Sequence, residues 1–413
     1  MPDYLQKFDA TPTADRWKLV RGWIFNEPLP FLAELRQNRP MLVLPGMTLA
    51  THFEDCREIL LRHDLFSVAL YQPKQGDYWM DQDDTAVHWR EKSIMKAILD
   101  REDIPAIRSY VADKAAALLA AAGGSIDAVM GLTRAVPLAL VQDWFGFVHG
   151  DAAKMREWSY WNQIDAFWNQ PFDSIIWSDP SKVVDARESA NKEMAIYLVA
   201  LIAGREAELK LGATPRDSVS RLLALSASKA VNFDLKRVII NTGGLLIGAV
   251  ETTSHAAVNA LEVLLQRPDV LAQARAAAMT DDAAAIDGFV YEALRFKPAF
   301  PYFFRTCEQD TVIGRGTNHE TPVAKGTTVL AVTHSAMFDP AAFSDPERFD
   351  STRDQGNHFH FGLGLHECLG RAIGQVMIPE IVRQSLRLSG LTAAAVDYKG
   401  GPVPEAWQWN WQH

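Results

Sequence analysis

Apolar positions with helical periodicity dominate the middle of the chain, from about residue 104 to residue 225. The longest predicted helix covers residues 234–266, because Asp234 can cap its first turn and Pro268 follows its last. Short apolar runs bounded by proline or glycine, at residues 41–44 and 327–332, favour strands. The pattern therefore predicts a mainly α protein with a small β region.

The chain lacks the sequence features that usually separate domains. There is no internal repeat, no low-complexity linker and no run of like charges in the sequence. Residues 71–84 have no period and are predicted to form a loop. We expect one domain to account for residues 1–413.

Composition excludes several classes of protein. The chain has 413 residues, 48% of them hydrophobic, and its 41 Lys plus Arg against 51 Asp plus Glu give a net charge of −10, which disfavours a nucleic-acid binder. Only three cysteines are present, which fits a reducing, cytoplasmic location. The N-terminal residues lack the apolar core of a signal peptide, and residues 243–250 fall short of the ~20 residues that a membrane span needs. We expect no membrane partner.

The middle of the predicted long helix departs from good helix-forming sequence. It contains Gly243, Gly244 and Gly248, followed by Glu251 and Thr252. Glycine costs ~1 kcal/mol relative to alanine inside a helix, and hydroxyl groups compete for backbone carbonyls. A threonine bonded to the carbonyl one turn earlier would explain Thr252 alone, but not the whole group. The composition therefore indicates a functional segment.

The stretch 361–370 combines glycines, a histidine and Cys368 just before a predicted helix that begins near Arg371. A thiolate at this position is stabilised by the helix dipole and by free backbone N–H groups, so it could bind a metal. Two alternatives stay open. Cys368 could be a small buried apolar residue, as we expect for Cys56 and Cys307. It could also join His358, His360 and His366 in a zinc site, although no second cysteine pair completes one.

The same stretch resembles the haem-binding loop of the cytochrome P450 superfamily, Phe-x-x-Gly-x-x-x-Cys-x-Gly. Phe361, Gly364, Cys368 and Gly370 match this motif, and His366 matches its usual basic position. The resemblance implies a single-domain fold with a long central helix over haem b, iron protoporphyrin IX. Its iron would be bound by Cys368. His358 and His360 receive no role from the resemblance.

Three basic residues resemble the haem-propionate contacts of the family. His88 and Lys92 correspond to a His-x-x-x-Arg motif, in which Lys92 keeps the charge but loses the bidentate geometry of arginine. Arg305 corresponds to the later propionate-binding arginine, and His366 is expected to contribute as well. Without the resemblance, His88 and Lys92 would be read as a solvated helix face.

The segment from Gly248 to Thr252 resembles the oxygen-binding motif of the family, with Ala249 in place of the commoner glycine. The resemblance implies that the helix opens locally there and that Glu251 and Thr252 relay protons. Further residues resemble positions that line the substrate pocket: Ala249, Val250, Phe300, Pro301 and Phe303. Aromatic residues at helical spacing could roof this pocket or could be plain core: Trp158, Trp161, Phe167 and Trp168.

Glu292 and Arg295 match the Glu-x-x-Arg motif of the family, which locks the core beside the haem loop. They stand three residues apart, so they share one helix face. The motif needs a third, later arginine. We expect Arg348, in Pro346-Glu347-Arg348-Phe349, to be that residue.

The resemblance implies an oxidoreductase, a monooxygenase that inserts one oxygen atom from O2 into a small, largely apolar organic substrate by hydroxylation or O-dealkylation. Electrons would come from a ferredoxin or flavodoxin-type donor with its reductase. Four basic residues could form its docking patch: Arg90, Lys92, Lys96 and Arg101. Two alternatives are a peroxide-driven peroxygenase or isomerase, which Glu251-Thr252 disfavours, and a non-enzymatic haem sensor.

Overall fold

The computed structural model describes residues 3–99 and 101–412. The chain divides into two compact units, each built from three segments. The first unit comprises the described residues of Met1–Pro73, Met80–Trp89 and Tyr291–Cys368, and the second those of Lys74–Trp79, Arg90–Val290 and Leu369–His413. The expectation that one domain accounts for the whole chain stays a prediction.

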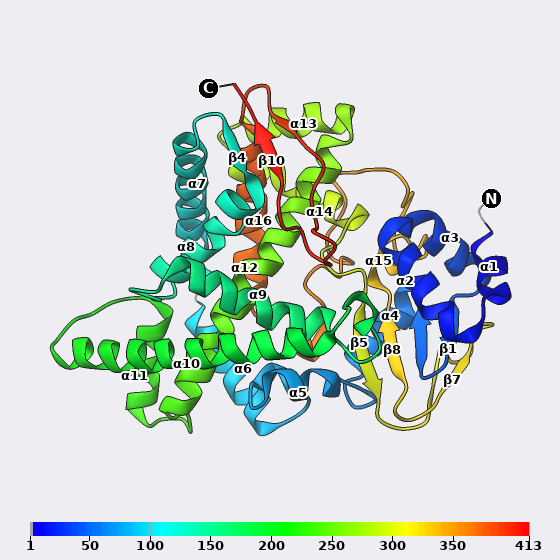
Figure 1. Ribbon diagram of the computed structural model, residues 1–413, viewed down its shortest axis with the longest axis horizontal. Helices are drawn as coiled ribbons and strands as arrows, with labels where there is room; N and C mark the ends of the chain where they lie inside the picture. The colour runs from blue at the N-terminus through cyan, green and yellow to red at the C-terminus, as the bar shows by residue number, and fades with distance from the viewer. Residues whose placement is uncertain (1–2, 100, 413) are drawn as a thin grey trace. The chain divides into compact units, whose positions relative to one another are not determined.

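The first unit combines short helices with a mixed sheet (Figure 1). Its helices are α1 (Tyr4–Ala10), α2 (Arg16–Asn26), α3 (Pro28–Asn38), α4 (Phe53–Leu61) and α15 (Thr333–Ala336). Its strands are β1 (Met41–Leu44), β2 (Met47–Ala50), β3 (Phe66–Ser67), β5 (Phe303–Cys307), β6 (Thr311–Ile313), β7 (Thr321–Val323) and β8 (Thr328–Ala331). Proline at the first position of α3 suits a helix start, because its missing N–H has no intrahelical partner there.

Five of these strands form one sheet in the order β1-β2-β8-β5-β3, and β6 pairs with β7 in a separate hairpin. Strand β2 runs parallel to β8, with Met47 opposite Thr328, and β5 runs antiparallel to β8. Apolar residues of α4 pack on this sheet in a buried cluster that includes Cys56 and Cys307. These two cysteines are therefore core residues, as predicted.

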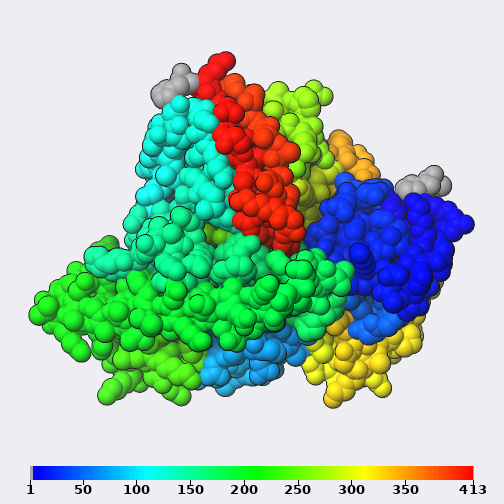
Figure 2. Space-filling view, viewed as in Figure 1, coloured from blue at the N-terminus to red at the C-terminus, as the bar shows by residue number. Residues whose placement is uncertain are grey.

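The second unit is mainly helical. Its elements are α7 (Ile104–Ala121), β4 (Ser125–Asp127), α8 (Ala135–Asp143), α9 (Ala152–Trp168), α10 (Pro180–Lys210), α11 (Ser218–Ser228), α12 (Leu235–Leu265), α13 (Pro268–Ala278), α16 (Arg371–Leu386), β9 (Thr392–Ala393) and β10 (Gln408–Asn410). Strand β10 lies between β4 and β9. Helix α12 is the centre of the unit, packed against α8, α9, α10, α11, α13 and α16 (Figure 1). The green surface in Figure 2 is built by α9, α10 and α11.

Most predicted elements agree with the structure. Helix α12 has 31 residues, and the Asp234 carboxylate accepts a hydrogen bond from the Arg237 N–H at 3.0 Å, which is the expected cap. The predicted loop at residues 71–84 instead contains short helical turns, α5 (Gln72–Gln75) and the 3-10 turn Trp79–Asp81. Two further helices, α6 (Ala86–Ile98) and α14 (Asp287–Phe296), each contribute residues to both units.

The mainly helical content with small sheets agrees with the expected fold class. None of the helices in residues 3–99 and 101–412 has both the length and the apolar character that crossing a membrane requires.

Candidate functional site

The Cys368 loop of the first unit is shaped by glycines. Gly362 and Gly364 have φ angles of +69° and +74°, a region that other residues rarely adopt. A Cβ on Gly364 would also lie 3.0 Å from the Leu60 carbonyl oxygen. The loop closes with a hydrogen bond of 2.8 Å from the Cys368 N–H to the Phe361 carbonyl, and Cys368 itself is exposed. Phe361 and Gly364 thus shape the loop, and the exposure of Cys368 argues against a core role.

Two histidines of the first unit lie edge to face, with the rings of His88 and His366 centred 5.2 Å apart. The Nδ1–H of His88 donates to the Gln82 carbonyl at 2.7 Å. The Nε2–H of His366 donates to the Asp83 carboxylate at 3.0 Å, and burial lowers the pKa of His366 to about 4. His366 is therefore neutral at pH 7, and its donor is engaged by Asp83. The structure gives no support to the predicted propionate contact of this residue.

Arg305 is a buried cation in β5, with 5% of its surface exposed. Its Nη1–H donates to the Phe304 carbonyl at 2.8 Å, and within the described residues it forms no ion pair. Burial lowers the pKa of Arg305, which reflects the cost of holding its charge away from water. A bound anion would compensate this charge. The site therefore fits a haem propionate, as the resemblance implied.

The zinc alternative finds no support in the first unit. The Nε2–H of His360 donates to the Tyr291 carbonyl at 3.1 Å, and His358 stacks on Phe343 with ring centroids 5.7 Å apart. Within residues 3–99 and 101–412, these histidines do not form a metal-ligand group with Cys368.

Lys92 and Gly370 belong to the second unit. Lys92 follows His88 by one turn of α6, is only 6% exposed, and places its Nζ 5.9 Å from the centroid of the Trp79 ring. Gly370 caps α16, and its carbonyl accepts from the Gly374 N–H at 2.8 Å. Because Lys92 is buried, it cannot belong to the predicted docking patch, whereas Lys96 and Arg101 are exposed.

Glu251 on α12 is held by an ion pair that the sequence did not predict. The Nε–H of Arg134 donates to its carboxylate at 2.9 Å, and the same guanidinium bonds Glu405 at 3.1 Å. Burial raises the pKa of Glu251 to about 7, against the lowering effect of Arg134. A carboxyl with this pKa can donate or accept a proton near neutral pH. Nothing in the spacing of Arg134 or Glu405 points to this cluster.

The Thr252 side chain makes a hydrogen bond to the backbone carbonyl one turn earlier in the helix, which is the structural alternative to a functional role. Its Oγ1–H donates to the Gly248 carbonyl at 2.7 Å. Helix α12 is continuous through these residues, so the structure does not show the local opening that the resemblance implied, and that expectation is corrected. The helix is tied nearby by α9, since Gln163 donates from Nε2 to the Ile247 carbonyl at 2.6 Å.

The three glycines of α12 differ in their surroundings. A Cβ on Gly244 would collide with the Tyr78 hydroxyl group, and one on Gly243 would lie 3.2 Å from Leu198. A Cβ on Gly248 would meet nothing within 4 Å. Packing therefore explains two of the glycines, and Gly248 faces open space.

The residues predicted to line the substrate pocket differ in their exposure. The rings of Phe300 and Phe303 lie 6.5 Å apart and are partly exposed, while Pro301 is buried. Ala249 is partly exposed, but Val250 is fully buried. A fully buried side chain cannot line an open cavity, so Val250 is a core residue. Trp158 and Trp168 are also mainly buried, which favours the core interpretation for them.

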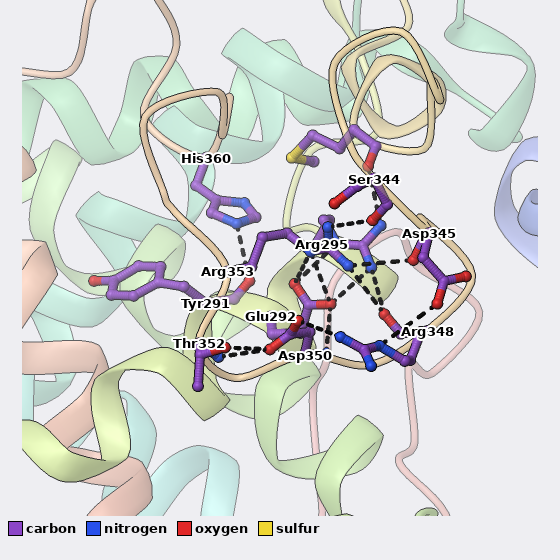
Figure 3. Close-up of polar contacts among 11 residues, drawn as sticks. Tyr291, Glu292, Arg295, Ser344, Asp345, Arg348, Asp350, Thr352, Arg353 and His360 are labelled. Atoms are coloured by element: carbon purple, nitrogen blue, oxygen red, sulfur yellow. Dashed lines mark hydrogen bonds and ion pairs between the residues drawn. The ribbon is translucent and has the colours of Figure 1, made fainter.

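Glu292 and Arg295 form the buried pair that the motif predicts, with hydrogen bonds of 2.7 and 2.9 Å (Figure 3). The third arginine is Arg353, whose Nε lies 3.4 Å from the Glu292 carboxylate. The prediction of Arg348 is wrong. Its side chain is 65% exposed and pairs with Asp350, and only its backbone carbonyl accepts a bond from Arg295. The chain turns between the two arginines, so only Arg353 points inward.

Comparison with known proteins identifies the family. The family model for Cytochrome P450 matches residues 150–388, more than half of the chain. The chain belongs to the cytochrome P450 family. A matched segment of 283 residues is 29% identical to cytochrome P450 monooxygenase PikC of Streptomyces venezuelae and covers 68% of this P450 but only 61% of PikC. The steroid C26-monooxygenase of Mycolicibacterium smegmatis is 24% identical over 363 residues, 86% of this P450 and 83% of that protein.

Solved structures agree on the fold. Ligand-free Mycobacterium smegmatis CYP164A2 superposes with a TM-score of 0.78 at 22% identity, covering 97% of this P450 and all of that chain. This similarity confirms the predicted fold, and the match to the family model confirms the predicted family. The predicted enzyme class, a cytochrome P450 monooxygenase, agrees with the names of the relatives. The family also implies haem.

Proposed function

We propose that this P450 is a haem-thiolate monooxygenase that inserts one oxygen atom from O2 into an apolar organic substrate by hydroxylation or O-dealkylation. The observation that carries the proposal is the pairing of two features within the first unit. Cys368 is exposed on a loop shaped by Gly362 and Gly364, and the same unit holds the buried cation Arg305, which forms no ion pair with any residue that the structure describes. A thiolate for iron and a cation for a propionate are what a haem requires from its protein.

Haem b, iron protoporphyrin IX, is the proposed cofactor, and the thiolate of Cys368 would bind its iron. When bound, the haem would supply the dioxygen chemistry of the reaction. Arg305 and His88 are proposed propionate contacts. Lys92 keeps the same proposed role, because it retains the positive charge of the usual arginine.

Glu251 and Thr252 are proposed to deliver protons during the reaction. General acid catalysis requires a donor whose pKa lies near the working pH, and the pKa of Glu251 is raised to about 7. Arg134 orients this carboxyl group from one side. The Thr252 hydroxyl, now bonded to Gly248, can exchange this partner by rotating about its Cα–Cβ bond.

The substrate is proposed to be small and largely apolar, and the partly exposed rings of Phe300 and Phe303 in the first unit are proposed to contact it. Relatives are named for steroid C26 oxidation and for erythromycin C-12 hydroxylation. These names support an apolar carbon skeleton as the site of attack. Spectral titration with terpenes, fatty acids, aromatic ethers and sterols would identify the class.

The proposed electron donor is a ferredoxin or flavodoxin-type protein with its reductase. Its docking patch is reduced to Arg90, Lys96 and Arg101, since Lys92 is buried. Charge reversal at Lys96 should slow electron transfer and weaken its dependence on salt. Unchanged rates at every ionic strength would remove Lys96 from the patch.

The test of the function is the pair of variants Cys368→Ser and Cys307→Ser. The reduced wild-type protein with carbon monoxide should show the Soret shift of a thiolate-bound haem and form product with NAD(P)H and redox partners. C368S should lose both, whereas C307S, a change at a buried cysteine of the sheet, should keep both. Product formed with peroxide alone would indicate a peroxygenase, and haem binding without any turnover would indicate a sensor.

A further inference from the structure

A cluster of metal-binding side chains lies in the first unit, apart from the residues assigned to haem. His52 precedes α4, Asp55 lies in the first turn of α4, and His319 lies in the turn between β6 and β7. One ligand atom from each residue lies within 4.8 Å of the other two. The rings of His52 and His319 meet edge to face, with centroids 4.7 Å apart. Two segments distant in sequence thus bring two imidazoles to one carboxylate.

The hydrogen bonds around the cluster leave a nitrogen on each imidazole that can serve as a metal ligand. A carbonyl oxygen only accepts, so the 3.0 Å contact with the Arg36 carbonyl puts the His52 proton on Nε2 and leaves Nδ1 as a lone-pair donor. His319 contacts the Asn318 side-chain oxygen through Nδ1 at 3.2 Å and Asp55 through Nε2 at 2.9 Å. A second hydrogen bond on the far nitrogen is the usual support of a metal-binding histidine.

Asp55 is a carboxylate with 4% of its surface exposed. Its carboxylate lies beside the two imidazole rings, with one ligand atom of each within 4.8 Å, and a buried carboxylate is stabilised by a nearby positive charge. The turn is also built around the His319 ring. Gly314 has a φ of +68°, and a Cβ there would lie 2.9 Å from the ring, so a side chain at this position would displace it.

We propose that His52, Asp55 and His319 bind a zinc ion that joins the β6–β7 turn to the start of α4. Two imidazole nitrogens and one carboxylate oxygen are a ligand set that suits zinc, with water completing the tetrahedron. Magnesium and calcium prefer sites made of oxygen alone. Ligands about 2 Å from zinc lie roughly 3.3 Å from one another in a tetrahedron, so small side-chain rotations close the site.

The alternative is a plain hydrogen bond between His319 and Asp55. That bond would need neither the His52 ring beside it nor the Nδ1 of His52 left as a lone pair. The proposed site depends on no residue assigned to haem or to the proposed function. Its success or failure is therefore independent of both.

The test uses the haem-loaded full chain after treatment with a chelator. Calorimetric titration with zinc chloride should give one site per chain, magnesium should give none, and zinc should raise the thermal midpoint. His52→Asn and Asp55→Asn should each weaken zinc binding at least ~100-fold. His63→Ala, which removes a histidine of the same unit outside the cluster, should bind like wild type.

The carbon monoxide spectrum of each variant reports whether it has folded around haem. His52 is the N-cap residue of α4 but its side chain makes no cap hydrogen bond, and asparagine is a favourable residue at that position, which limits any loss of stability from His52→Asn. Wild-type protein that binds no zinc would overturn the proposal. Zinc bound equally by His52→Asn, Asp55→Asn and His63→Ala would overturn it too.

Discussion

Glu251 carries its carboxyl group in a nearly fully buried position, and its pKa of about 7 predicts a specific pH dependence. A carboxyl that donates a proton must hold one, so turnover should fall as pH rises through 7, by about tenfold per unit beyond it. Glu251→Gln should lower kcat by about 100-fold and remove this decline, with little change in KM. Product formation measured from pH 5.5 to 9 checks both.

Arg134→Gln provides the matched variant, because it removes the charge that lowers the pKa of Glu251 while keeping a hydrogen-bond donor. The decline in turnover should then move to higher pH. A decline at the same pH in wild type and Arg134→Gln would show that another group is titrating.

Replacing Arg305 should stabilise the haem-free protein but weaken the retention of haem. A buried charge without an ion pair destabilises a fold, so Arg305→Met should raise the free energy of unfolding of the haem-free chain by about 1–3 kcal/mol. The same change should speed haem loss at least tenfold, because the propionate then lacks its counter-charge. Urea unfolding and haem transfer to an acceptor protein measure the two effects. A loss of stability in the haem-free form would contradict the assignment.

At the residue scale, sequence predicted the groups that belong to motifs and missed their partners. Cys368, Glu251 and Arg295 stand at motif spacings, and the structure gives each a setting that fits. Arg134 holds Glu251 from 117 residues before it, and Glu405, which bonds the same guanidinium, lies 154 residues after Glu251, as the numbers 134, 251 and 405 show. Such contacts follow from tertiary packing, which no local pattern encodes.

Two glycine-to-alanine substitutions within helix α12 should have different effects on stability. Alanine normally stabilises a helix by ~1 kcal/mol relative to glycine. Gly244→Ala should instead lower stability by about 1–3 kcal/mol, because its Cβ would collide with Tyr78. Gly248→Ala meets no neighbour and should be neutral or stabilising in the haem-free protein. Denaturant unfolding of both variants measures the contrast, and equal effects would contradict it.

Alanine substitution of two arginines that lie five residues apart, Arg348 and Arg353, should change stability by different amounts. Arg353 is 8% exposed and contacts Glu292, and it also donates to the Ser344 carbonyl at 2.8 Å. Arg353→Ala should therefore cost about 2 kcal/mol or more, since it unpairs buried acceptors. The control is Arg348→Ala, at an exposed side chain, which should change stability by less than ~0.5 kcal/mol. If Arg348→Ala lowered stability more than Arg353→Ala in thermal or urea unfolding, Arg348 and not Arg353 would be the third member of the Glu292–Arg295 network.

Element boundaries were predictable where a cap or a proline marked them, as at Asp234 and Pro268 around α12. The sequence could not predict whether Arg348 or Arg353 contacts Glu292. Both arginines follow the motif at plausible distances, and only the turn between them decides which side chain is buried. The short helical turns within residues 71–84 were missed for a related reason, because one turn is too short to develop a period.

At the scale of the whole molecule, the interleaving of the two units predicts cooperative unfolding. Each unit is assembled from three chain segments, and these segments alternate between the two units along the chain. Neither unit is therefore a continuous piece of chain that could fold before the rest is available. We expect the haem-loaded protein to unfold in one transition, as one domain would.

The distribution of tryptophans allows a test of whether the two units unfold together. Trp17, Trp23 and Trp89 lie in the first unit and the remaining tryptophans in the second, so tryptophan fluorescence reports mainly on the second unit. Hydrogen exchange of peptides from β5 and β8 reports on the first unit. Urea midpoints should coincide for the two probes. If exchange in β5 rises at a lower urea concentration than the fluorescence change, the units unfold separately, and the single-domain prediction fails for this chain.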